Sequence, residues 1–489
     1  MRCIVELMSQ SSSGATTDGL SVTSTPNREP MLAGFPWVSA IILYTLSWGW
    51  SLLRPNTLYW DDWAIVFKHQ EKGIWLSIKK SGLAPWTRLI EWQLLLIGPW
   101  SICLATFLCF FLTGICVFGI LKKAPTVEVE YARMLVLLFL VVPVNHARIS
   151  IIVFDYTFSY FLFFLGWLVL VRYQSFKGFI FAWLVLFLSL KTHSLLFFVL
   201  LPFLHFVWLE REQLLKYKRV NLVHIQIGLI AIMPFLYLIL RQVFWPPSEF
   251  FRSYQRPTVK GAILGAQLFI PVASATLVYL FWRKNKVRSN RNFVIFLFGV
   301  GITALALLPY FLGGSYPDYV SVIAFRADWG SRHQLLMPLG LAATIVGLNG
   351  MGTFSKKNQV FKICMGFSLM FNLYSASTYY LDSTKKNEVV KLFNSRIDIE
   401  EDTQIVIIDD SKRFNGRGSS YRDYEWKGLL SLAGKKFQDV SEERLCDEQP
   451  SAIQMTLKSE TPYLKALVTR NLGLYFEVKP CSEVLAENG

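Results

Sequence analysis

The sequence predicts an all-α polytopic membrane protein with about 11 transmembrane helices and a small C-terminal α/β domain. Of the 489 residues, 53% are hydrophobic and only 17% are charged, a composition too apolar for a soluble protein to expose. Apolar runs long enough for membrane-spanning helices recur up to about residue 380. Beyond that point the chain becomes charged and shows short strand and helix patterns.

Eleven apolar runs are candidate transmembrane helices. They are 36–53, 97–121, 131–145, 157–171, 178–190, 194–208, 222–240, 261–282, 293–312, 334–350 and 361–380. The loops between them form two alternating sets, one with 17 Lys or Arg in 50 residues and the other with 14 in 96. The positive-inside rule assigns the more basic set to the cytoplasm. The N-terminus is then expected inside and the C-terminal domain outside.

The basic residues lie mainly in these loops, so the net charge of +15 does not indicate a nucleic-acid partner. Residues 1–35 are rich in Ser, Thr and Gly, which predicts a disordered cytoplasmic tail. Residues 36–380 are expected to form the transmembrane domain. Residues 381–489 predict a soluble periplasmic α/β domain, with strands at 404–409, 436–440 and 472–478 and a helix at 424–432.

Cysteines and glycosylation motifs bear on the compartment. Cys446 and Cys481 are the two cysteines of the predicted exported domain, where either a disulfide between them or two free thiols is consistent with the sequence. No Asn-x-Ser/Thr acceptor occurs in the chain, which favours a bacterial envelope over a eukaryotic lumen. We therefore expect an integral protein of the bacterial cytoplasmic (inner) membrane.

The first outer loop, 54–95, carries an adjacent acid pair, Asp61-Asp62, followed by Trp63. Two stretches of this loop, 63–70 and 74–80, alternate apolar and basic residues at roughly helical spacing and predict short interfacial helices. Indole rings suit the lipid headgroup layer, so the tryptophans in and beside the loop predict that the acids lie at membrane level. These tryptophans are Trp60, Trp63, Trp75, Trp86, Trp92 and Trp100.

Carboxylates at this depth are costly and usually have a function. Asp61 or Asp62 could accept the proton of an attacking hydroxyl group. The pair could also hold a divalent cation, Mg or Mn, that neutralises a departing phosphate. The structural alternative is that one of them caps the helix beginning at Trp63. Both interpretations stay open, because one acid could cap while its neighbour reacts.

The inner N-terminus, the Tyr-x-Asp-Asp-Trp motif and the interfacial helices resemble the GT-C superfamily of membrane glycosyltransferases. The nearest resemblance is to bacterial glucosyltransferases that modify the O-antigen of lipopolysaccharide. It covers roughly residues 36–210. It implies a polyprenyl-phosphate-linked sugar donor and a glycan or lipid acceptor beside the membrane lipids. The family usually shows Gly-Arg-Pro-Leu where this chain has Thr87-Arg88-Leu89-Ile90, and Arg88 is the matching basic residue.

The resemblance also implies roles for residues of later outer segments. Asp155 would support the acids of the first loop, or alternatively cap the following span. Lys191 and His193 would lie near the donor phosphate, or alternatively snorkel to the interface. Arg332 and His333 precede a late span, where a guanidinium can bind phosphate oxygens. In the C-terminal domain, the loop 409–418 is either a solvated turn or a contact for the glycan acceptor.

Two other functions remain open. An O-antigen polymerase or ligase is also polytopic and also handles polyprenyl-linked glycans, but we would expect it to carry a large Arg-rich late outer loop. A non-catalytic transporter or flippase predicts ionisable residues within spans, whereas most charges here lie at loop edges. The sequence favours the glycosyltransferase over both.

Overall fold

The structure is a computed structural model of the chain, which divides into two compact units, Met1–Ala33 and Gly34–Gly489. The second unit contains nearly all of the described residues and every element discussed below. The structure describes residues 32–63, 65–66, 85–124, 127–173, 175–190, 193–216, 222–246, 248–249, 258–259, 263, 290–312, 329–351, 358–395, 404–416, 420–435, 440–441 and 452–488. The tail predicted at 1–35 and the interfacial helices predicted at 63–70 and 74–80 lie largely outside these residues.

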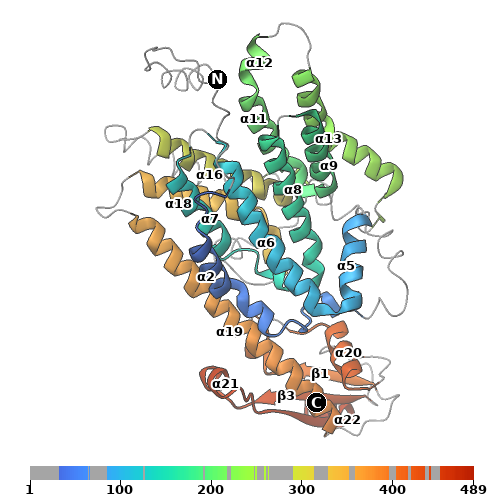
Figure 1. The fold of residues 1–489 in the computed structure, drawn as a ribbon. Coiled ribbons are helices and arrows are strands. Elements are labelled where there is room, and N and C mark those ends of the chain that lie inside the picture. Colours follow the sequence, from blue (N-terminus) through green and yellow to red (C-terminus); the bar gives the residue numbers. More distant parts are fainter. Residues whose placement is uncertain are drawn as a thin grey trace. The chain divides into compact units, whose positions relative to one another are not determined.

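Helices make up most of the described chain (Figure 1). The α-helices before the sheet are α2 (Trp37–Trp48), α5 (Pro85–Ile97), α6 (Pro99–Leu121), α7 (Val129–Val141), α8 (Phe154–Arg172), α9 (Phe176–Ser189), α10 (His193–Phe198), α11 (Leu200–Leu209), α12 (Arg211–Lys216), α13 (Leu222–Phe244), α16 (Asn290–Leu312), α18 (Met337–Gly350) and α19 (Gln359–Ser395). The 3-10 helices of this region are η1 (Gly49–Leu53), η2 (His146–Ile149), η3 (Ile151–Val153) and η4 (Trp329–Gln334).

Local sequence explains several helix boundaries. Helix α6 begins with Pro99 at its first position, after Gly98 with a φ of 135° that a side chain would not tolerate. Helix α9 begins after Ser175, whose hydroxyl accepts a hydrogen bond from the backbone N–H of Gly178 at 3.2 Å. Pro338 occupies the first turn of α18, where its missing N–H is tolerated.

Four helices among the described residues are long and apolar enough to cross a membrane. They are Pro99–Leu121, Ile151–Arg172, Leu222–Phe244 and Arg291–Pro309. Together with the composition, they make this a mostly helical membrane protein. The predicted number of about 11 spans is wrong for the described residues. Most of the predicted runs are indeed helical, but α2, α9 and α18 have only 12 to 14 residues. The run 194–208 is divided between α10 and α11, and the run 261–282 lies almost entirely outside the described residues.

Small residues allow α16 and α18 to pack closely. A Cβ atom added to Gly347 would lie 2.5 Å from the backbone nitrogen of Phe296, and Gly299 and Gly340 similarly face backbone atoms of the opposite helix. Close backbone approach through glycine is the usual way in which apolar helices associate where no hydrophobic driving force operates. The two helices therefore form a tightly packed pair.

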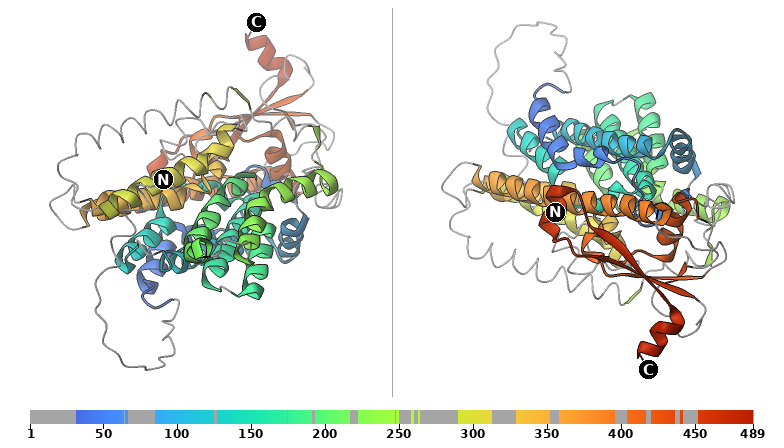
Figure 2. Two further views of the ribbon diagram at one scale, coloured as in Figure 1. Left: turned by 90° about the horizontal axis from the view of Figure 1, so that it is seen from above. Right: turned by 90° about the horizontal axis from the view of Figure 1, so that it is seen from below.

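Helix α19 connects the apolar helices to the sheet (Figure 1). Its first half packs against α2, α7 and α18, and the Asn372 amide donates to the Val141 carbonyl oxygen at 2.8 Å. Its second half packs against the C-terminal elements, with Leu381, Val389 and Phe393 in a shared core. The predicted domain boundary at 380 falls inside this continuous helix. Figure 2 shows α19 running beside the sheet.

The C-terminal region is a small α/β fold, as its strand and helix patterns predict. Its strands are β1 (Ile405–Asp409), β2 (Val440–Ser441), β3 (Ile453–Ser459) and β4 (Leu474–Pro480), in the order β2-β1-β3-β4. Strand β1 pairs in parallel with β2 and β3, with Ile407 opposite Met455, whereas β3 and β4 are antiparallel. The other elements are η5 (Lys412–Phe414), α20 (Asp423–Leu432), α21 (Tyr463–Thr469) and α22 (Cys481–Asn488).

Two details of this region differ from or extend the expectations. Strand β3 was not predicted, and Gln454, Thr456 and Lys458 give it a polar face that contrasts with the apolar strand β1. Cys481 is disulfide-bonded, while Cys446, its predicted partner, lies outside the described residues.

Candidate functional site

The acid pair lies in the short segment that follows η1. Trp60 adopts a φ of 47°, a left-handed conformation that is rare for a bulky residue. Such a conformation persists only where the surrounding structure imposes it, and it is common at functional sites. The turn directs Asp61 and Asp62 into different environments. The two adjacent acids therefore have different chemistry.

Asp62 is fully buried and bonded to two loops. One carboxylate oxygen accepts from the Tyr59 backbone N–H at 3.0 Å. The other accepts from the Ser150 hydroxyl at 2.5 Å and from the Ile152 N–H at 3.0 Å. These donors lie outside the helix at Trp63, so Asp62 joins two loops rather than capping that helix. Burial raises the pKa of Asp62 to about 6, although its hydrogen bonds oppose the shift.

Asp61 is the more accessible acid, with 30% of its side chain exposed. One of its carboxylate oxygens accepts a hydrogen bond from the Tyr424 hydroxyl of α20 at 2.6 Å. The Arg422 guanidinium lies 3.7 Å from the same oxygen. Asp61 thus contacts the C-terminal α/β region while remaining open to solvent.

A pocket lies beside this contact, between the first loop, α19 and α20. Two of its lining residues adjoin the hydrogen-bonded pair in the chain: Trp60 precedes Asp61, and Glu425 follows Tyr424. The remaining lining residues are Tyr59, Asp382, Lys386, Gly416 and Tyr421. Aromatic faces and carboxylates in one pocket can contact the apolar face of a sugar ring and accept hydrogen bonds from its hydroxyls.

The polar groups of this pocket are held in place. Lys386 donates to Asp382 and to the Leu58 carbonyl oxygen, both at 2.8 Å, and lies 4.5 Å from the centre of the Tyr59 ring. The Tyr421 hydroxyl donates to Asp382 at 2.5 Å. Burial raises the pKa of Glu425 to about 7, despite the nearby Lys386. A group that titrates near neutral pH is suited to proton transfer.

A second buried network supports the pocket from the end of β1. The Lys385 ammonium donates to both oxygens of Asp409 at 2.7 Å and to the Asn415 amide oxygen at 2.5 Å. Ser411 also donates to Asp409 through its backbone N–H and its hydroxyl. Residues 409–415 are therefore not a fully solvated turn. They anchor α19 to the sheet, because Lys385 needs their oxygens in order to be buried.

Sequence reasoning did not select Asp382, Lys386, Tyr421 or Glu425. A usable signal is the run Asp382-Ser383-Thr384-Lys385-Lys386, which places charges at the end of an apolar helical run. At helical spacing, Asp382 and Lys386 share one face and form an i,i+4 ion pair. The partners on α20 and the first loop are distant in sequence, so no local pattern could identify them.

Arg88 and Asp155, two of the predicted site residues, bind each other. The Arg88 Nε atom lies 2.7 Å from Asp155, and the same guanidinium also pairs with Glu91. Both acids are buried, and Asp155 lies in the first turn of α8. This arrangement makes Arg88 a bridge between α5 and α8. Two of its nitrogen atoms, Nε and Nη1, are therefore occupied by carboxylates.

The other predicted residues are only partly described. Lys191 lies outside the described residues, as do the side chains of His193 and His333. Arg332 is half-buried in η4. Its neighbours Ser331 and Gln334 accept hydrogen bonds from the Ala147 and Asn145 N–H groups, at 2.8 and 3.0 Å. Arg332 therefore lies on an element fixed to the 145–150 segment.

The acid pair does not fit a divalent cation as it stands. Both oxygens of Asp62 are already occupied by three donors, and Asp61 faces Tyr424 and Arg422. Within the described part of the chain, no three His, Cys, Asp or Glu side chains gather as a metal site would require. We assign no chemical step to a metal.

The fold and this pocket define a helical membrane protein with a polar, aromatic pocket at its junction with an α/β region. No protein-family model matches the chain, and no curated protein matches it either. The function must therefore be inferred from the site.

Proposed function

We propose that this protein is a GT-C-type membrane glycosyltransferase that moves a sugar from a polyprenyl-phosphate donor to a glycan or lipid acceptor. In this proposal the acid pair lies on the outer face of the bacterial inner membrane, and the acceptor belongs to the cell envelope, with O-antigen as the favoured class. The observation that carries the proposal is the accessible carboxylate of Asp61 next to a pocket of aromatic rings and buried acids.

Asp61 is the proposed general base. The acceptor hydroxyl oxygen forms a bond to the anomeric carbon of the donor sugar, and its proton passes to the Asp61 carboxylate. The bond from that carbon to the phosphate oxygen breaks, and the prenyl phosphate leaves with the electron pair. The partial exposure of Asp61 supports this role, because an attacking hydroxyl must be able to reach the carboxylate.

Asp62 and Asp155 are proposed as positioning residues. Asp62 holds the first loop against the 150–152 segment, and Asp155 holds Arg88. Lys191, His193, Arg332 and His333 remain candidates for the donor phosphate, because cations and their N–H groups bind phosphate oxygens. Tyr59, Trp60 and Tyr421 are proposed to contact the transferred sugar or the acceptor.

The experiment compares lipid-linked and envelope glycans, by mass spectrometry, in cells with and without the protein. We expect one glycan to lose a single sugar residue when the protein is absent. Loss of polymerised repeats would instead indicate a polymerase or ligase. Unchanged glycans together with altered uptake of an unmodified substrate into vesicles would indicate a transporter.

Complementation with single variants then tests the base. Asp61→Asn is expected to insert normally and to reduce transfer by about 100-fold or more, the range for loss of a general base. Asp423→Asn is the matched control, because Asp423 is exposed in the same region and lies outside the pocket. Full transfer by Asp61→Asn would remove the proposed role of this carboxylate.

A further inference from the structure

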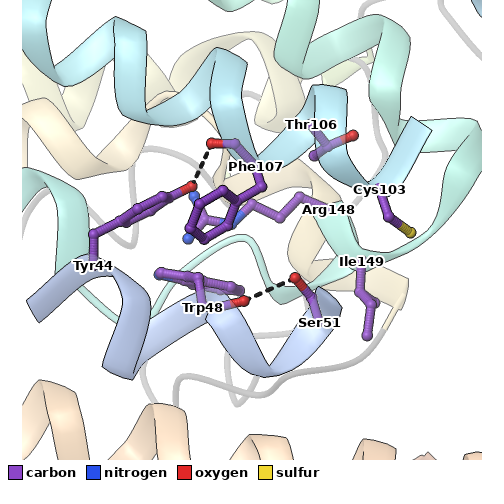
Figure 3. Close-up of a pocket in the computed structure, with 8 residues that line it drawn as sticks. All are labelled: Tyr44, Trp48, Ser51, Cys103, Thr106, Phe107, Arg148 and Ile149. Carbon is purple, nitrogen blue, oxygen red and sulfur yellow. Dashed lines mark hydrogen bonds between the residues drawn. The ribbon is translucent and has the colours of Figure 1, made fainter. Parts of the chain in front are cut away.

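A buried arginine that sequence reasoning did not select lies in a second pocket. Arg148 belongs to η2, in the segment between α7 and α8, and is only 5% exposed. Figure 3 shows its side chain reaching over Trp48 toward Tyr44 and Phe107. The pocket is lined by Tyr44 and Trp48 of α2, Ser51 of η1, Cys103, Thr106 and Phe107 of α6, and Arg148 and Ile149 of η2.

Aromatic rings cover the guanidinium of Arg148. Its central carbon lies 3.2 Å from the centre of the Trp48 ring and 3.9 Å from that of Phe110. Cation–π contacts involve the faces of the planar guanidinium, so the N–H groups along its edge can still donate hydrogen bonds. Arg148 therefore presents its donors at the rim of the guanidinium plane.

No acid of the described chain forms an ion pair with Arg148, and its Nη1 atom has no hydrogen-bond partner. Its polar neighbours are the hydroxyls of Tyr44 and Tyr160, and Tyr44 already donates to the Phe107 carbonyl oxygen at 2.9 Å. Burial lowers the pKa of Arg148 to about 9, so the side chain still carries its charge at neutral pH. A buried, charged guanidinium without an anion is unfavourable, because proteins pair such groups or leave them in water.

We propose that this pocket binds the phosphate group of a lipid, with Arg148 as its receptor. A guanidinium edge matches phosphate oxygens in bidentate geometry. Apolar residues form much of the pocket wall, and α6, which contributes Cys103, Thr106 and Phe107, is apolar enough to cross a membrane. An apolar surface beside an anion receptor fits a hydrocarbon chain attached to a phosphate, a combination that membranes supply.

The inference goes beyond the proposed sugar transfer, because it assigns a ligand to Arg148 and requires no reaction. A protein that binds the lipid phosphate but transfers no sugar would keep this site and overturn the proposed enzyme. Sugar transfer without phosphate binding at Arg148 would keep the proposed enzyme and overturn this site.

The test uses the full chain, purified in a neutral maltoside detergent. The Tm is measured at increasing concentrations of farnesyl phosphate. Farnesol, inorganic phosphate and phosphatidylglycerol are the comparison probes. We expect a saturable rise of a few degrees in the Tm with farnesyl phosphate, because a ligand that binds only the folded state stabilises it. Farnesol, which lacks the phosphate, should give no such rise. An equal affinity for inorganic phosphate would overturn a lipid as the source, and an equal affinity for phosphatidylglycerol would still support a lipid phosphate.

Variants assign the response to the residue. Arg148→Met should weaken farnesyl phosphate binding by roughly tenfold or more, the loss expected for a charged hydrogen-bonded contact. Arg148→Lys should also weaken it, because a compact ammonium lacks the bidentate fork, and it replaces the Met variant if that variant does not fold. Arg211→Met removes a different guanidinium, 4.6 Å from the centre of the Trp208 ring, and should bind as the native protein does. Native affinity in both Arg148 variants, or no Tm shift in the native protein, would overturn the proposal.

Discussion

The Ser150 hydroxyl donates a hydrogen bond to the Asp62 carboxylate at 2.5 Å, across 88 positions of the chain. The contact joins the loop after η1 to the loop before α8, and the Ile152 N–H reinforces it. It separates the roles of two adjacent acids. Asp62 holds the loops together from a buried position, whereas Asp61 remains partly exposed.

Asp62→Ala should therefore destabilise the protein. The substitution leaves the buried donors of Tyr59, Ser150 and Ile152 without their acceptor, and each unsatisfied group costs about 1–3 kcal/mol. The measurement is thermal unfolding in detergent, where Asp61→Asn serves as the control and should change the Tm little. A native Tm for Asp62→Ala would show that these hydrogen bonds add nothing to stability.

The raised pKa of Asp62 predicts a pH dependence of stability. Burial moves its pKa from 3.8 to about 6 in the folded protein, so between these values the folded state binds more protons than the unfolded state. The stability contributed by Asp62 should fall as the pH rises through this interval, by on the order of 3 kcal/mol, and level off above about 6.

The Tm of the native protein and of Asp62→Asn, measured from pH 4 to 8, checks this dependence, because the amide does not titrate. Glu425, whose pKa burial raises to about 7, contributes a fall of the same sign and should persist in the variant. Only the difference between the two curves reports on Asp62. A constant difference across the acid range would contradict the raised pKa.

Apolar periodicity was sufficient to predict where most helices lie, because a run such as 97–121 has few alternatives to a helix. It could not predict how many helices cross a membrane. In the apolar run at 36–53, the α-helix ends at Trp48 and the chain continues as the 3-10 helix η1. The apolar run is therefore longer than the α-helix it contains. The apolar strand β1 was equally recognisable, whereas β3 was missed because its alternation is half polar.

Only the part of the candidate site that lies in one short segment of the sequence could be predicted. The Asp61-Asp62 motif indicates the loop that borders the described pocket, but the different environments of the two acids depend on Ser150 and Tyr424. Both partners are far away in sequence, and neither belongs to a motif. Arg148 was passed over for the same reason, since an isolated arginine in a loop gives no sign of its burial between Trp48 and Phe110.

Packing of α16 against α18 predicts opposite effects for two glycine substitutions. Gly347→Ala places a Cβ 2.5 Å from the Phe296 nitrogen, so the helices must separate and the Tm should fall. Gly301→Ala, in α16, meets no atom within 4 Å and should raise stability slightly, by about 0.5–1 kcal/mol, because alanine favours the helix. Thermal unfolding of both variants in one detergent tests the pair. An unchanged Tm in Gly347→Ala would mean that the helices are not in close contact.

Arg88 bridges Asp155 and Glu91, and its substitution distinguishes a structural role from a role in binding the donor phosphate. Arg88→Met leaves two buried carboxylates without the guanidinium, so we expect a loss of about 3–5 kcal/mol in stability, seen as a lower Tm. Adding Asp155→Asn to this variant should restore part of the loss, because one of the two buried charges is then gone. A residue that served only the donor phosphate would behave differently: Arg88→Met would keep the native Tm and lose sugar transfer, and the Asp155→Asn addition would restore nothing. The ion-pair geometry leads us to expect the first outcome.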